Sequence, residues 1–132
     1  MAGLADYPVA AVLRAEDLGR AKRFYTDVLG LRPVDEYSSE GEIFLEAGNG
    51  SMMTIYSRPG MPAPQNTTLG FAVPAEKFDA VVSELRGKGV VFEEYDLPEM
   101  GLKTVNGVAD YDGNKVAWFL DTEGNIVNLG SM

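Results

Sequence analysis

The chain has 132 residues, of which 45% are hydrophobic and 23% are charged, a balance typical of one soluble globular domain. Its 20 acidic and 11 basic residues give a net charge of -9, and no cluster of Lys or Arg offers the basic face that nucleic acid requires. Cysteine and histidine are absent, which excludes disulfides, thiolate catalysis and the usual sulfur and imidazole ligands of metals. The amino-terminal residues have no basic segment before an apolar run, so we expect no signal peptide and no membrane span, and a cytoplasmic protein.

The first half of the chain is predicted to fold as βαβββ. A strand at 9–15 leads into a helix with Asp17 as its N-cap, and apolar side chains recur in that helix at three- and four-residue steps up to Gly30. Three extended segments separated by short turns then follow, at 31–37, 42–47 and 51–57.

The second half repeats this order after a linker. Residues 58–66 contain three prolines and a glycine, which separates module one, about 8–57, from module two, about 67–131. Module two has a strand at 67–73, a helix at 74–89 and an extended segment at 90–97. The apolar stripe of its helix consists of Phe78, Val81, Val82 and Leu85. An insertion at about 98–113, interpreted either as a binding loop or as a plain surface loop, precedes a closing hairpin.

Two motifs resemble a known superfamily. The segment "DLGRAKRFYTDVLGL" at 17–31 and the ending "WFLDTEGNI" at 118–126 resemble the vicinal oxygen chelate superfamily. That superfamily contains glyoxalase I, bleomycin-resistance proteins and extradiol dioxygenases. The resemblance implies an α+β fold, with one domain over residues 1–132 built from two tandem βαβββ modules. Each module would have a cupped mixed sheet, a helix on the convex side and a ligand site in the concavity. It also implies a homodimer.

The same resemblance implies where a metal would be bound. Metal-dependent members hold a divalent ion with one residue from each of four strands. The register of the motifs assigns these positions to Ala10, Thr54, Thr68 and Asn128. None of the four offers the imidazole, thiolate or carboxylate donors that a catalytic divalent ion needs. We therefore predict no metal and no other cofactor.

Strand alternation predicts which side chains share the concave face. The predicted walls are Phe44, Met52, Tyr56 and Trp118, and the predicted polar points are Arg14, Glu46, Thr54, Thr68 and Asn128. The opposite, helix-facing core is assigned Ile43, Leu45, Phe71, Ala117 and Phe119. Two plainer interpretations stay open: Arg14 and Glu46 could pair with each other, and Tyr56 and Trp118 could be ordinary packing residues.

This pattern favours a metal-free protein that binds or sequesters a small organic molecule, cationic or aromatic, as bleomycin-resistance proteins sequester their drug. One alternative is a lyase, isomerase or dioxygenase with an atypical metal site or none, in which Glu46, Tyr56 and Arg14 are the acid-base candidates. Another is a fold used only for protein interaction. The expected partner is a small molecule, with neither nucleic acid nor membrane.

Overall fold

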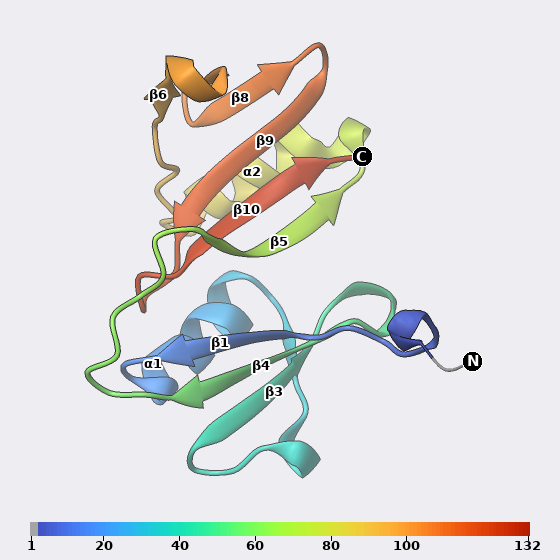
Figure 1. Cartoon of the computed structure of the whole chain (residues 1–132), viewed down its shortest axis with the longest axis vertical. Coiled ribbons are helices and arrows are strands. Elements are labelled where there is room, and N and C mark those ends of the chain that lie inside the picture. The colour runs from blue at the N-terminus through green and yellow to red at the C-terminus, as the bar shows by residue number, and fades with distance from the viewer. Residues whose placement is uncertain (1–2) are drawn as a thin grey trace. The chain divides into compact units, whose positions relative to one another are not determined.

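The computed structural model describes residues 3–132, which divide after Pro62 into two compact units (Figure 1). Each unit has one four-stranded mixed sheet and a helix, and the strand orders are β1-β4-β3-β2 and β5-β10-β9-β8. The α+β fold of two βαβββ modules that the sequence predicts is confirmed. Of the helices within residues 3–132, none has the length and hydropathy of a membrane span.

The first unit begins its helix where the sequence predicts. The backbone N–H of Arg20 donates to Asp17 Oδ1 at 3.0 Å, which satisfies one of the free donors of the first turn. The helix then widens, because the N–H of Leu29 donates to the carbonyl of Phe24, and it ends at Gly30 with a φ of 79°. The elements of this unit are β1 (Ala11–Ala15), α1 (Leu18–Arg23), a π turn (Phe24–Val28), β2 (Arg32–Pro33), β3 (Glu42–Glu46) and β4 (Met52–Ser57).

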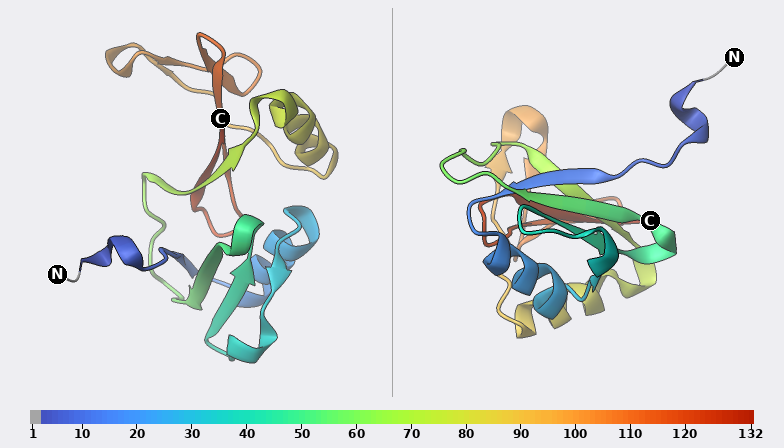
Figure 2. Two further views of the ribbon diagram at one scale, coloured as in Figure 1. Left: turned by 90° about the vertical axis from the view of Figure 1, so that its right-hand side faces the viewer. Right: turned by 90° about the horizontal axis from the view of Figure 1, so that it is seen from below.

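The first sheet buries one face beneath α1 and the π turn, which lie along it in Figure 2. Strand β1 runs parallel to β4, and β4 runs antiparallel to β3. Along each strand the residues of the helix side are buried and alternate with residues of the other face. The core of this unit is made by Leu13, Ala15, Ala21, Tyr25, Ile43, Leu45, Met53 and Ile55.

The second unit repeats the arrangement with α2 across one face of its sheet (Figure 1). Strand β10 is parallel to β5 and antiparallel to β9, and a turn with φ of 55° at Asp112 and 94° at Gly113 joins β8 to β9. The core consists of Phe78, Val82, Leu85, Phe92, Ala117, Phe119, Val127 and Leu129. The elements are β5 (Thr67–Val73), α2 (Phe78–Gly87), β6 (Asp96–Leu97), β7 (Leu102–Lys103), β8 (Val108–Tyr111), β9 (Asn114–Leu120) and β10 (Ile126–Ser131).

The predicted extended segments after the two helices are much shorter than expected. In the first unit only Arg32–Pro33 pairs as a strand, because Pro33 has no N–H to continue the ladder, and Asp35–Tyr37 forms a 3-10 turn. In the second unit Phe92 forms only an isolated bridge with Phe119, and Asp96–Leu97 pairs with Leu102–Lys103, so the start of the predicted insertion is a small hairpin. The predicted core residues Phe71 and Val81 are only half-buried.

Candidate functional site

The helix-free face of the first sheet presents its side chains in three rows, set by the strand register. One row contains Met52 and Glu46, with Ala10 immediately before β1; the next, Val12, Thr54 and Phe44; the last, Arg14, Tyr56 and Glu42. Side chains directly opposite one another in such rows are close enough to form one surface. All the concave residues predicted for module one therefore lie on a single face.

A hollow of about 490 Å³ opens on this face. Its size is within the range typical of small-molecule sites, about 300–1,000 Å³. Most of its wall is apolar. It is lined by Ala10, Tyr37, Glu42, Phe44, Met52 and Thr54. The structure thus brings together three of the predicted residues, Phe44, Met52 and Thr54, and adds two that the sequence interpretation missed, Tyr37 and Glu42.

Tyr37 is positioned by the 3-10 turn that replaces the predicted strand. The Ser38 hydroxyl donates to the carbonyl of Val34 at 3.0 Å and accepts from the N–H of Phe44 at 3.1 Å, which fastens the turn to β3. The ring of Tyr37 then meets the ring of Phe44 edge to face, with 6.0 Å between centroids and 69° between planes. Tyr37 therefore forms an aromatic wall beside a sheet to which it does not belong.

A second hollow of about 420 Å³ adjoins the first and shares Tyr37 and Met52 with it. Two of its carboxylates already lie beside cations: Arg32 Nε lies 3.1 Å from Glu46 Oε1, and Lys22 Nζ lies 3.7 Å from Asp35 Oδ1. The second hollow is lined by Pro33, Val34, Asp35, Glu36, Tyr37, Glu46 and Met52.

The proposed pairing of Arg14 with Glu46 is wrong. The two residues lie in different rows of the face, at opposite ends of it, and Glu46 pairs with Arg32 across β2 and β3. Arg14 is buried, with 7% of its surface exposed, and does not line the hollow. Tyr56 also lies outside the hollow, with the guanidinium of Arg58 5.9 Å from its ring centroid.

On the helix-free face of the second sheet, Asn128 lies between Gly70 on β5 and Trp118 on β9. The ring of Trp118 packs edge to face against Tyr95, with centroids 5.5 Å apart. Burial raises the pKa of the Tyr95 hydroxyl above its usual value, and the charge of Glu93 adds to the shift, so this hydroxyl stays protonated at neutral pH. The predicted positions of Trp118 and Asn128 on this face agree with the register.

Of the polar residues predicted on the concave face of the second module, Thr68 departs from the expected strand register. The register of β5 and β10 shifts between Ile126 and Val127, so that Thr68 falls in a β-bulge. Its hydroxyl donates to the carbonyl of Asn66 at 3.3 Å, a local bond within the same strand end. The Thr68 hydroxyl therefore stabilises the local backbone at the start of β5.

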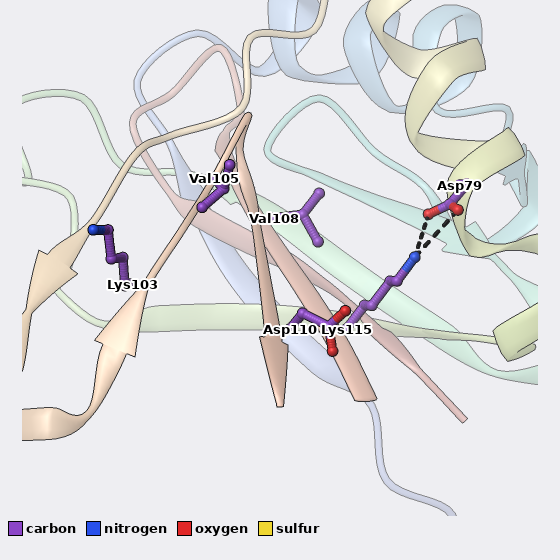
Figure 3. Close-up of a pocket in the computed structure, with 6 residues that line it drawn as sticks. All are labelled: Asp79, Lys103, Val105, Val108, Asp110 and Lys115. Atoms are coloured by element: carbon purple, nitrogen blue, oxygen red, sulfur yellow. Dashed lines mark hydrogen bonds and ion pairs between the residues drawn. The ribbon is translucent and has the colours of Figure 1, made fainter. Parts of the chain in front are cut away.

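A third hollow, of about 370 Å³, lies on the helix side of the second sheet (Figure 3). The ammonium of Lys115 contacts both carboxylate oxygens of Asp79, at 3.0 and 3.2 Å, and Asp110 Oδ1 accepts from the N–H of Gly113 at 2.7 Å. Its charges therefore largely cancel, and it lies on the opposite face of the sheet from Asn128. The lining residues are Asp79, Lys103, Val105, Val108, Asp110 and Lys115.

Comparison with protein families matches residues 8–128 to the Glyoxalase/Bleomycin resistance protein/Dioxygenase superfamily. The chain belongs to this superfamily. A search of curated protein sequences gives no significant match.

Solved structures of the superfamily share the fold at low sequence identity. A glyoxalase/dioxygenase from Nostoc punctiforme has a TM-score of 0.71 and 13% identity, over 99% of this chain and 94% of that one. The oxidase ChaP-H2 has a TM-score of 0.66 and 21% identity, over 96% and 93%. The fosfomycin resistance protein FosX from Listeria monocytogenes has a TM-score of 0.65 and 17% identity, over 96% and 90%. These likenesses establish the fold alone.

The residues that the sequence resemblance assigns to metal-binding positions do not fit a catalytic divalent ion. Ala10 has no donor atom, the Thr68 hydroxyl bonds to Asn66, and Thr54 and Asn128 are neutral. Within residues 3–132 no group of three or more His, Cys, Asp or Glu side chains is arranged to hold an ion. Any metal bound in this chain would need a donor set different from that of the metal-dependent members.

Proposed function

We propose that this protein binds and sequesters a small organic molecule in the first hollow, without a catalytic metal. The observation that carries the proposal is the hollow of about 490 Å³ on the helix-free face, with apolar walls and few polar groups. The neutral side chains at the four metal positions support the metal-free part. A Listeria monocytogenes FosX structure, by contrast, was solved in complex with Mn(II).

The metal-free part is tested by elemental analysis of protein purified without chelator. We expect zinc, iron, nickel and manganese each well below one ion per chain. A stoichiometric amount of any of them would overturn this part and would favour the alternative function, a lyase, isomerase or dioxygenase with an atypical site.

The binding part is tested by a thermal-shift screen of antibiotics and metabolites. A ligand at a hundred times its dissociation constant should stabilise the fold by about 2.7 kcal/mol. Met52→Trp fills the hollow with a bulkier side chain and should lower the affinity of a hit roughly tenfold or more. Met100→Trp is the matched control, since Met100 is 70% exposed and lies outside the hollow. Equal effects of the two variants, or no hits, would contradict binding in this hollow.

The homodimer and the cytoplasmic location remain predictions. Each sheet has two edge strands, β1 and β2 in the first and β5 and β8 in the second, and such edges favour pairing with another chain. Static light scattering at micromolar concentration tests the dimer, and a monomer there would contradict it.

A further inference from the structure

Thr54 gives the first hollow a hydroxyl group that is free to bond to a ligand. Only 8% of the residue is exposed, and its side chain lines the hollow. Within residues 3–132 no hydrogen bond to its hydroxyl is formed. The hydroxyl is open to the hollow and is not sealed in the core, so a ligand there can donate a hydrogen bond to it or accept one from it.

The charge that faces this hollow is negative. Glu42 is the one carboxylate among its lining residues, and no Lys or Arg lines it. Within the described part of the chain Glu42 forms no ion pair, whereas Glu46 in the adjoining hollow is already paired with Arg32. An anionic ligand would be repelled here, and a cation would find one uncompensated partner.

The aromatic side chains add to this preference. Tyr37 is 61% exposed, and its ring stands beside that of Phe44, two residues along β3 from Glu42. Aromatic faces attract cations, and their apolar area accepts the body of an organic molecule. Met52 and Ala10 extend that apolar area on the side away from Glu42.

We propose that the first hollow selects an organic monocation. Its ammonium group lies against Glu42 and the Tyr37 ring, its apolar or aromatic body packs on Phe44 and Met52, and a hydroxyl or carbonyl of the ligand bonds to the Thr54 hydroxyl. This inference rests on the proposed function and names the class of molecule that the same hollow takes.

Three probes that share a 4-hydroxyphenylethyl body and differ in the terminal group test the inference: tyramine (ammonium), tyrosol (hydroxyl) and 3-(4-hydroxyphenyl)propionate (carboxylate). Amide chemical shifts are followed by NMR on the full chain at neutral pH. Tyramine should perturb the residues that line the hollow. It should bind roughly tenfold more tightly than tyrosol, because it forms one charged hydrogen bond that tyrosol cannot form. The carboxylate should not bind measurably.

Matched variants identify the groups responsible. Glu42→Gln should weaken tyramine binding roughly tenfold and leave tyrosol unchanged. Glu40→Gln removes the same charge from an exposed residue outside the hollow and should change neither. Thr54→Val keeps the side-chain shape and should remove the advantage of tyramine over phenethylamine, which has no phenol hydroxyl.

Three results would overturn the inference while leaving the proposed function intact. One is tyrosol binding as tightly as tyramine; another is Glu42→Gln behaving like Glu40→Gln. If none of the three probes perturbs the hollow while neutral or anionic hits from the screen do, the cation preference is likewise wrong. If the screen yields no ligand whose binding Met52→Trp weakens, the proposed function itself is wrong.

Discussion

At the scale of single residues, Gly70 and Asn128 approach each other closely on the helix-free face of the second sheet. A Cβ built on Gly70 would lie 2.4 Å from Asn128 Oδ1, and the backbone of Gly70 is outside the left-handed region. Glycine is therefore needed there for space and not for conformation. The amide oxygen of Asn128 occupies the space that a side chain at position 70 would take.

Replacing Gly70 should consequently couple to Asn128. Gly70→Ala forces the Asn128 amide to turn away, and we expect it to lower the free energy of unfolding by about 1 kcal/mol. In an Asn128→Ala background the same change should be neutral or stabilising by about 0.4–1 kcal/mol, because alanine restricts the unfolded chain. A double-mutant cycle from urea unfolding measures the coupling. The same effect of Gly70→Ala in both backgrounds would refute the contact.

At the scale of elements, the turn between β9 and β10 is held by one buried carboxylate. Asp121 Oδ1 accepts from the N–H groups of Glu123 and Asn125, each at 2.8 Å, and Asp121 Oδ2 accepts from the side-chain amide of Asn125 at 2.9 Å. Asn125 is 1% exposed. The "DTEGN" part of the superfamily ending thus has a structural role: it fixes the hairpin that carries Trp118 and Asn128.

Asp121→Ala should therefore destabilise the protein strongly. It leaves buried donors without an acceptor, and we expect a loss of about 2–4 kcal/mol in the free energy of unfolding. Asp96→Ala removes a carboxylate from an exposed residue and should change stability by less than about 0.5 kcal/mol. Urea titrations of both variants followed by circular dichroism make the comparison, and similar midpoints would contradict a structural role for the turn.

Elements with strong local signals were predictable from the sequence. The helix starting after Asp17 has a capping side chain and an apolar stripe, and alternation along β3 and β4 correctly grouped Phe44, Met52 and Thr54. The 3-10 turn that carries Tyr37 was missed because its residues also suit a strand, and only Pro33 hinted otherwise. Glu42 could have been found, since it lies two residues before Phe44 in β3 and therefore on the same face of the strand. The bulge at Thr68 leaves no such signal, because it arises from pairing with β10.

At the scale of the whole molecule, the net charge of -9 acts on any charged ligand before contact. Such long-range attraction is screened by salt, since the Debye length falls from about 30 Å at 0.01 M to about 8 Å at 0.15 M. The negative surface and Glu42 therefore favour the same class of molecule, one by attraction at a distance and the other by contact.

The affinity for tyramine should accordingly fall by roughly threefold between these two ionic strengths, whereas that for tyrosol should not change. Isothermal titration calorimetry in buffers that differ only in sodium chloride measures both. An equal loss for the two probes would show that salt acts on the protein and not on the attraction between charges.

The two Asn-Gly pairs of the chain should deamidate at different rates on storage. Asn-Gly bonds deamidate when the glycine nitrogen attacks the asparagine amide, which requires that nitrogen to be accessible. The N–H of Gly107 is buried and donates to Glu94, whereas Asn49 and Gly50 lie exposed in the turn between β3 and β4. Deamidation should therefore begin at Asn49, adding a negative charge at the end of the strand that presents Glu42, Phe44 and Glu46.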